Sequence, residues 1–228
     1  EHLADIGGTT RASFDASLNR LHVKRVTLLQ LHNAVTASRG DEPTSITPQD
    51  VLGKNGVLRG FLELQEQGLV QHIGLTGIGQ PPALREVIDS GAFDTLQVPY
   101  NLLNPSAGAA APRDFNGTDY GNIIADCSTH GMGVFSIRVF AGGALLGNPP
   151  SAHTLKTPFF PLGLYERDRA RAAQLASRLP RGQSLHASAI RFALAHPHIH
   201  SAIIGFRTCE EIDEAHTALQ TKDRFPSP

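Results

Sequence analysis

The sequence predicts a parallel α/β protein, in which short strands alternate with helices. Five apolar segments have the length and composition of buried strands, and amphipathic segments with helical spacing lie between them. The predicted strands are residues 26–31, 70–75, 95–99, 132–137 and 201–204. The chain has 228 residues, of which 40% are hydrophobic. This is enough to bury a core, and we expect one domain over residues 1–228.

Composition excludes several classes of function. The net charge is −1, so no electrostatic attraction to nucleic acid or to anionic lipid is expected. No apolar run approaches the roughly 20 residues that cross a bilayer, and no signal segment opens the chain. We therefore expect a soluble, cytoplasmic protein without a nucleic-acid or membrane partner.

Cysteine and histidine give no metal motif. Cys127 and Cys209 lie far apart, which fits a reducing compartment and small, buried or half-buried side chains. The 11 histidines are scattered, and His196, His198 and His200 alternate around a proline like solvated loop residues. We expect no metal there.

The first third of the chain predicts a helix, a strand and a loop. Thr9 or Thr10 would cap the helix, whose apolar side chains recur with helical spacing up to Leu21. Residues 26–31 are apolar nearly throughout, as expected of a strand buried on both faces. Residues 33–55 are polar, and a loop of this length tends to be functional.

The remaining elements follow from apolar spacing and from glycine and proline. A helix between Gly56 and Gly68 precedes the second strand, and a helix from Pro81 to Gly91 precedes the third. Further helices are predicted at residues 120–129, 165–179, 185–196 and 209–220. The long connections at residues 102–117 and 138–163 are predicted as loops.

The alternation of strands and helices is typical of a (β/α)8 TIM barrel, which needs eight strands and about 250 residues. Five strands preceded by a helix correspond to the last five of such a barrel. The chain opens at Glu1, and its only methionine is Met132. We therefore expect an N-terminally incomplete record of a longer barrel.

Six segments then resemble motifs of the aldo-keto reductase superfamily, in the order of that family. They read SLNRL at 17–21, LLQLH at 28–32, QHIGLT at 71–76, QVPYN at 97–101, GMGV at 131–134 and IIGFRT at 203–208. Each motif is weak alone, but six in register are specific. The resemblance implies an oxidoreductase that interconverts an aldehyde or ketone and its alcohol with a nicotinamide cofactor. The segment Ile137-Arg138-Val139 resembles the sugar (aldose) dehydrogenase branch, which converts a lactol into a lactone.

The resemblance also implies roles for individual residues. His32 would orient the substrate carbonyl, whose oxygen gains negative charge during hydride transfer and so favours hydrogen-bond donors. Gln97 would hold the nicotinamide carboxamide with help from Thr76, since an amide can both donate and accept. Ile137 stands where the family often stacks an aromatic ring on the nicotinamide, and Arg138 follows it.

The phosphate end of the cofactor is implied by the last helix. Phe206, Arg207 and Thr208 would lie at its N-terminus, where backbone N–H groups favour phosphate. Arg207 could pair with a 2′-phosphate, which favours NADP(H) over NAD(H). Glu211 and Glu214 match positions near the ribose and adenine, and a glutamate there can instead favour NAD(H). Gly142-Gly143 would be a turn over the pyrophosphate.

The sequence departs from the family in its acid–base groups. The catalytic Asp, Tyr and Lys of the family precede the fourth barrel strand, and no residue here aligns with them. Tyr100, Tyr120 and Tyr165 match other positions. A non-catalytic cofactor-binding or interaction subunit is therefore an alternative, and an enzyme acting on phosphorylated sugars is a weaker one.

Several residues also have a purely structural reading. His32 could be a structural histidine and Arg207 a surface residue. Arg167, Arg169 and Arg171 are expected to form a solvated helix face. The substrate pocket would be built by loops 33–55, 102–117 and 144–163, which carry no identifiable chemistry of their own.

Overall fold

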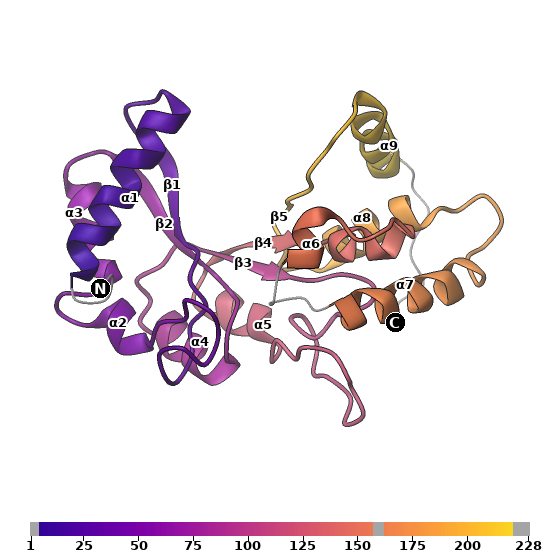
Figure 1. Ribbon diagram of the computed structural model, residues 1–228, viewed down its shortest axis with the longest axis horizontal. Coiled ribbons are helices and arrows are strands. Elements are labelled where there is room, and N and C mark those ends of the chain that lie inside the picture. The colour runs from indigo at the N-terminus through magenta and orange to yellow at the C-terminus, as the bar shows by residue number, and fades with distance from the viewer. Residues whose placement is uncertain (1–4, 157–161, 221–228) are drawn as a thin grey trace. The chain divides into compact units, whose positions relative to one another are not determined.

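The computed structural model describes residues 5–156 and 162–220 (Figure 1). The chain forms two compact units, and each is described by itself. The first unit lies within Glu1–Val98 and Ile123–Val134, and the second lies within Pro99–Asn122 and Phe135–Pro228.

The described residues contain five strands in one sheet, whose order follows the sequence. The strands are β1 (Val26–Leu31), β2 (Val70–Thr76), β3 (Thr95–Pro99), β4 (Gly133–Ile137) and β5 (Ser201–Ala202). The pairs β1–β2, β2–β3 and β4–β5 are parallel. This confirms the parallel α/β prediction, although β5 ends two residues earlier than predicted.

Helices alternate with these strands as predicted. The helices are α1 (Ile6–Leu21), α2 (Pro48–Leu52), α3 (Val57–Glu66), α4 (Pro81–Asp89), α5 (Ile123–Thr129), α6 (Ala152–Lys156), α7 (Leu162–Ala176), α8 (Leu185–Ala195) and α9 (Cys209–Gln220), with a 3₁₀ segment, η1, at Ala141–Leu146. In the described part of the chain, no helix has both the length and the apolar character needed to cross a membrane.

The sheet of the first unit has two unlike faces. In β3, Leu96 and Val98 are fully buried, whereas Thr95 and Gln97 are half-buried. The helices α3 and α4 bury apolar stripes, with Val57, Phe61, Leu64, Leu84, Val87 and Ile88 in the core. The prediction that residues 26–31 are buried on both faces is wrong, because only Leu31 of β1 is buried. One face of the sheet is apolar, and the other carries polar side chains.

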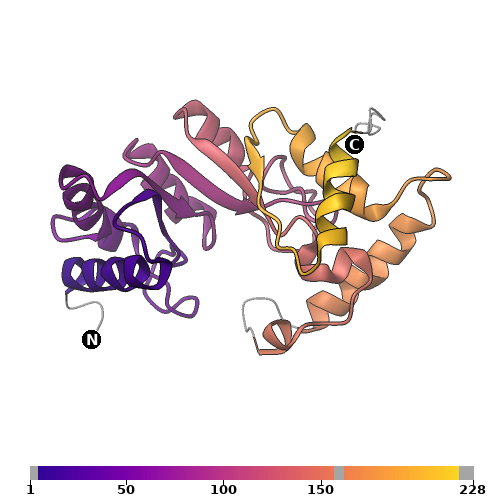
Figure 2. The same cartoon turned by 90° about the horizontal axis from the view of Figure 1, so that it is seen from above.

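Two predictions about the first unit need correction. The first helix begins at Ile6, before the predicted threonine caps, because Asp5 accepts a hydrogen bond from the backbone N–H of Gly8 and acts as the N-cap. The predicted loop 33–55 contains α2, which Thr47 and Asp50 start with a capping box. Figure 1 and Figure 2 show α1, in indigo, lying against α3, which it contacts.

The second unit is mainly helical. α9 packs against α8, and α7 packs against η1. The predicted loop 138–163 contains η1 and α6, and its residues 157–161 lie outside the described residues. Residues up to Asn122 belong to this unit, whereas the helix predicted from Tyr120 begins at Ile123 and lies in the first unit, because Gly121 and Asn122 adopt left-handed backbone angles.

The cysteines and the three clustered histidines differ partly from expectation. Both cysteines are free, and burial raises the pKa of Cys127 to about 12, whereas Cys209 is exposed rather than buried. His196 is not a solvated loop residue, because it ends α8 and its ring lies edge-on to Tyr100, 5.4 Å away. Burial lowers the pKa of His196. No group of three potential metal ligands occurs among the described residues.

Candidate functional site

In the first unit, three predicted site residues lie at the C-terminal ends of strands. His32 follows β1, Thr76 ends β2 and Gln97 lies in β3. The strand register places Thr76 beside Gln97, so both side chains lie on the same face of the sheet. Thr76 is buried, Gln97 is half-buried and His32 is exposed. The structure therefore brings Thr76 and Gln97 together and leaves the His32 ring accessible to a ligand.

Gln30 is a residue of this region that the sequence analysis missed. Its side-chain oxygen accepts a hydrogen bond from Nε2 of Gln97, although the two residues are 67 positions apart. The backbone of Gln97 is also held, because its carbonyl oxygen accepts from the N–H of Gly77 at 2.6 Å. Gln30 precedes His32 by two residues and so lies on the same strand face, which is the signal that the sequence offered.

Beside these residues lies a cavity of about 300 Å³ between α1 and β1. Gln30, His32 and Asn33 line it on the strand side, and Phe14 and Ser17 line it on the helix side. Its lining is mixed: apolar side chains alternate with polar ones, among them the hydroxyl groups that α1 contributes. Such a cavity is suited to a small organic molecule.

In the second unit, a larger cavity of about 710 Å³ gathers most of the predicted cofactor residues. Its lining includes Arg138, Phe206, Arg207, Thr208, Glu211 and Glu214. Ile137 is absent from this lining, and its carbonyl oxygen accepts from the N–H of Tyr100 at 3.2 Å. Phe140 and His186, which no sequence motif indicated, also line this cavity, and their rings stack 4.8 Å apart.

Arg138 occupies an unusual backbone position at this cavity. Its φ angle is +55°, in the left-handed region, and its carbonyl oxygen accepts from Nδ2 of Asn101 at 3.0 Å. Burial lowers the pKa of Arg138. Gly142 and Gly143 follow with φ angles of +69° and +101°, and a Cβ on Gly142 would lie 3.2 Å from Nη2 of Arg138. The positive φ angles, which other residues rarely adopt, favour glycine at both positions of this turn.

The N-terminus of α9 carries an internal ion pair. Glu211 accepts from the backbone N–H of Arg207 at 2.6 Å and from Nη2 of its guanidinium at 2.8 Å. These two interactions hold the pKa of Glu211 below its usual value. Thr208 accepts from the N–H of Glu211 at 3.3 Å. The Arg207 side chain is 76% exposed, so its guanidinium is open to an anion that displaces Glu211.

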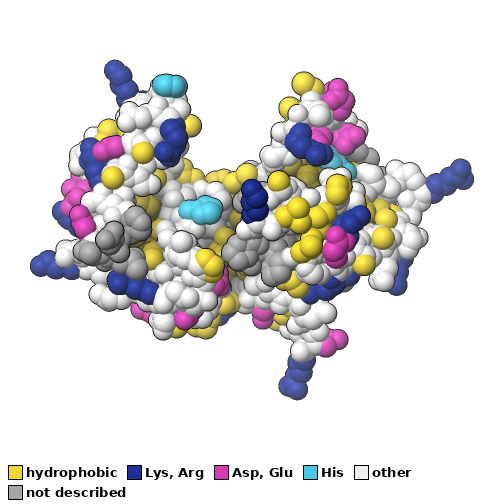
Figure 3. Space-filling model, viewed as in Figure 1, with side chains coloured by type: hydrophobic (Ala, Val, Ile, Leu, Met, Phe, Trp, Pro, Cys, Tyr) yellow, Lys and Arg dark blue, Asp and Glu magenta, His cyan; other side chains and the backbone are white. Residues whose placement is uncertain are grey.

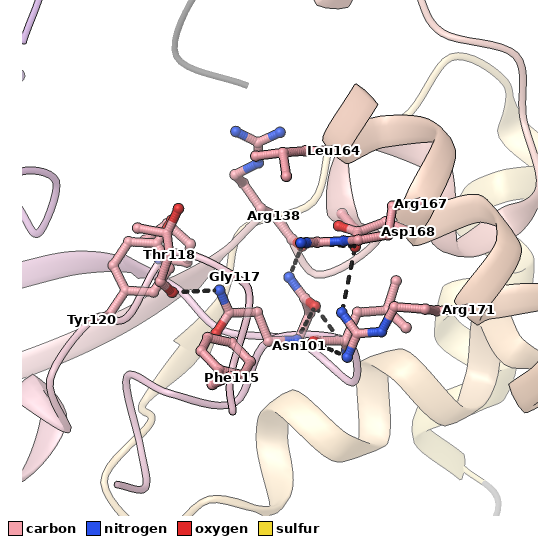
Figure 4. A pocket seen from close by; sticks show the side chains of 14 residues that line it. Asn101, Phe115, Gly117, Thr118, Tyr120, Arg138, Leu164, Arg167, Asp168 and Arg171 are labelled. Atoms are coloured by element: carbon pink, nitrogen blue, oxygen red, sulfur yellow. Dashed lines mark hydrogen bonds and ion pairs between the residues drawn. The ribbon is translucent and has the colours of Figure 1, made fainter. Parts of the chain in front are cut away.

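Another group of charges lies in the second unit, around Asp168 (Figure 4). Arg167 and Arg171 both pair with Asp168, at 3.1 Å and 3.4 Å. The expectation of a solvated face is wrong for Arg167, whose side chain is 26% exposed. Arg171 and Arg169 are 38% and 37% exposed, and Arg169 pairs with the half-exposed Glu166. The space beside them is about 30 Å³, about enough for one water molecule.

Charges of both signs are scattered over the face drawn in Figure 3. This agrees with the near-zero net charge of the chain. Surface charge therefore does not single out either cavity, and the two candidate cavities are identified by their shape and by the polar groups that line them.

The sequence matches the Aldo/keto reductase family over residues 7–225. The structure is similar to aldo-keto reductase AKR11C1 from Bacillus halodurans in its apo and holo forms, each with 18% identity and a TM-score of 0.65. The similarity covers 96% of this chain but 65% of the apo chain and 64% of the holo chain, so this chain spans just under two thirds of their length. At this identity the likeness concerns the fold alone. No curated protein matches the sequence.

Proposed function

Because the chain belongs to the Aldo/keto reductase family, we propose that it is an oxidoreductase that uses NAD(P)(H). It interconverts an aldehyde or ketone and its alcohol, or a sugar lactol and its lactone, by hydride transfer. The five parallel strands correspond to the last five of the family barrel. The observation that carries the proposal is the 710 Å³ cavity, where Arg207, Thr208 and Glu211 line one space with the glycine turn.

The residues of this cavity fit the phosphate and ribose parts of the cofactor. The turn at Gly142 and Gly143 has no side chains in the way of a pyrophosphate, and Arg138 beside it supplies positive charge. Arg207 binds the 2′-phosphate and Glu211 then turns to the ribose hydroxyls. Phe206, which is 44% exposed, offers an apolar surface for the adenine.

The residues of the first unit act on the nicotinamide and the substrate. Gln97 and Thr76 hold the nicotinamide carboxamide. His32 donates a hydrogen bond to the carbonyl oxygen, which stabilises the negative charge that develops there. The cofactor supplies the hydride. We assign no proton donor, because Tyr100, Tyr120 and Tyr165 are all at least 93% buried, with exposed fractions of 7%, 7% and 0%.

We propose that NADP(H) is preferred over NAD(H). The exposed guanidinium of Arg207 supports this preference, because a 2′-phosphate carries more charge than the Glu211 carboxylate with which it competes. The opposite preference would follow if Glu211 kept Arg207 and bound the ribose itself. The two cases differ in how removal of each charge changes the affinity for NADPH and NADH.

The test is fluorescence titration of the protein with NADPH and with NADH. The variant R207Q should weaken NADPH binding about tenfold and leave NADH unchanged, whereas R169Q, which removes an exposed pair on α7, should change neither. Equal losses for both cofactors, or none, would contradict the assignment of Arg207.

Activity separates the enzyme from the alternative of a cofactor-binding subunit. NADPH oxidation with a panel of aldehydes, ketones and aldoses should show turnover, and H32A should reduce it about 100-fold. Saturable NADPH binding without turnover on the whole panel would favour the non-catalytic subunit.

A further inference from the structure

Arg138 has a backbone conformation that residues other than glycine usually avoid. Its φ angle of +55° lies in the left-handed region, where a Cβ is disfavoured. Such a conformation persists only where the surrounding structure holds it. Arg138 directly follows β4, and its carbonyl oxygen accepts from the N–H of Ala141 at 2.7 Å, which closes the turn after the strand.

A second donor to the same carbonyl comes from the loop after β3. Nδ2 of Asn101 donates to the oxygen of Arg138 at 3.0 Å, although the two residues are 37 positions apart. Both residues belong to the second unit, and Figure 4 shows them in one group of side chains. Asn101 is 5% exposed, so water has little access to this bond. The Arg138 carbonyl is therefore held by two donors.

Backbone groups alone determine the orientation of the Asn101 amide. Its Oδ1 accepts from the N–H groups of Leu103 and Asn104, both at 3.0 Å, and these groups can only donate. Its Nδ2 faces the Arg138 carbonyl oxygen, which can only accept. Rotation of the amide by half a turn would break all three hydrogen bonds. The loop thus holds Asn101, and Asn101 holds Arg138.

The conformation of Arg138 decides where its side chain lies. A Cβ on Gly142 would lie 3.2 Å from Nη2 of Arg138, so the guanidinium lies against the glycine turn. Arg138, Gly142 and Gly143 line the same cavity of about 710 Å³. An extended backbone at residue 138 would point its Cα–Cβ bond elsewhere and take the guanidinium away from the turn.

We propose that Asn101 is a positioning residue, which holds Arg138 in its left-handed conformation so that the guanidinium meets the pyrophosphate of the cofactor. This inference rests on the proposed function, in which the turn at Gly142 and Gly143 faces that pyrophosphate. A guanidinium that is already in place loses less freedom when it binds a phosphate. Without Asn101, the turn relaxes and the cation is no longer aligned.

The test measures by titration calorimetry the dissociation constants of NADPH, NADH and adenosine 2′-phosphate. The first two carry the pyrophosphate, whereas adenosine 2′-phosphate carries only the part assigned to Phe206 and Arg207. N101A should weaken NADPH and NADH about fivefold each and adenosine 2′-phosphate less than about twofold, since the loss is that of one hydrogen bond at the pyrophosphate. R138Q should weaken both dinucleotides about tenfold, because it removes a charged partner.

A double variant shows whether Asn101 acts through Arg138. Once the guanidinium is absent, removal of its support should matter little, so the combination of N101A and R138Q should bind NADPH within about twofold of R138Q alone. N101D is a second variant at the same position. Its carboxylate still accepts from the N–H groups of Leu103 and Asn104, which keeps the loop folded, but it cannot donate to Arg138. It should weaken both dinucleotides at least as much as N101A.

The matched control is N104A, in the same loop. Asn104 makes hydrogen bonds of the same kind, but its side chain bonds to Ser106 and Thr118 rather than to Arg138. N104A should therefore leave all three dissociation constants within about twofold of the native values. Urea unfolding verifies that each variant is folded.

The outcomes separate this inference from the proposed function. Native affinity for NADPH and NADH in N101A and N101D, or an equal loss in N104A, would overturn the role of Asn101 and leave the proposed function intact. Multiplied losses in the double variant would show that Asn101 acts independently of Arg138, which also overturns the inference. If the native protein binds none of the three ligands, the proposed function fails, and the inference fails with it.

Discussion

Two polar loops, 33–47 in the first unit and 102–118 in the second, are each held to a helix by one buried aspartate. In the first loop, Arg39 donates to both oxygens of Asp50, which also accepts from the backbone N–H of Thr47 at 3.0 Å. Asp50 lies in the first turn of α2, and its side chain is 6% exposed. The carboxylate itself thus ties the loop to the helix.

The second loop uses its aspartate indirectly. Asp168 is on α7 and pairs with Arg167 and Arg171, which donate to backbone carbonyls of the loop. Nη1 of Arg167 donates to the oxygen of Asn116 at 2.5 Å, and Nη2 of Arg171 donates to that of Leu103 at 2.9 Å. Here the Asp168 carboxylate orients two arginines, and the arginines bind the loop.

The difference predicts how each loop fails. Loss of Asp50 frees one loop arginine and opens a helix cap. Loss of Asp168 leaves the positive charges of Arg167 and Arg171 close together without the anion that they share. Both contacts to the loop are made by these two arginines. We therefore expect the second arrangement to be more sensitive to its carboxylate.

The largest effect is expected for D168N. The substitution should lower the free energy of unfolding by about 3 kcal/mol, because it leaves two partly buried guanidinium groups unpaired. Urea denaturation measures this, with E166Q on the exposed Arg169 pair as a control that should change little. A loss no larger than that of E166Q would show that the arginines hold the loop without Asp168.

A smaller loss, about 2 kcal/mol, is expected for D50A. It removes a helix cap and the partner of Arg39, but the Arg39 side chain is 48% exposed and can be solvated. The matched control is D15A, which breaks the exposed pair with Arg11 on α1. Equal losses in the free energy of unfolding for D50A and D15A would show that Asp50 stabilises the first loop no more than an exposed ion pair does.

Lowering the pH should show directly how much Asp50 contributes to the free energy of unfolding. The Arg39 guanidinium is the main cause that lowers the pKa of Asp50 to about 2 from its usual 3.8. Since the folded pKa is the lower one, the stabilisation is complete above about pH 4 and is lost as the pH falls towards 2. At pH 3 the native protein should have lost about 1 kcal/mol of it. The unfolding curves of native protein and D50A should therefore converge with decreasing pH.

The smallest effects are expected for single arginines. R39Q should increase amide hydrogen exchange in residues 33–47 only, and R171Q in residues 102–118 only, each by about twofold to fivefold. Mass spectrometry of the exchanged peptides distinguishes the two loops. If either variant increased hydrogen exchange in both loops, Arg39 and Arg171 would not each stabilise only their own loop.

Elements with strong local signals were predicted well. Val57, Phe61 and Leu64 repeat with helical spacing between two glycines, and α3 has these limits within two residues. The strand β3 has the predicted bounds. The helix α2 was missed because a five-residue helix has little propensity of its own and depends on the distant Arg39.

For the candidate site, the sequence predicts where its residues lie along the strands but not which side chains they contact. The positions of His32, Thr76 and Gln97 at strand ends follow from the order of strands and loops. The partners of these residues do not, because a sequence gives no register between strands. Neither the contact of Gln30 with Gln97 nor the pairing of Arg207 with Glu211 was therefore predicted.

The sequence by itself determined the alternation of strands and helices, their approximate limits, the family resemblance and the strand ends that carry the polar residues. These depend on spacing and turn chemistry within a few residues. Only the tertiary structure decided that Asn101 holds the carbonyl of Arg138, and which arginines Asp50 and Asp168 hold. Such contacts join residues brought together by strand register and helix packing, which no local pattern encodes.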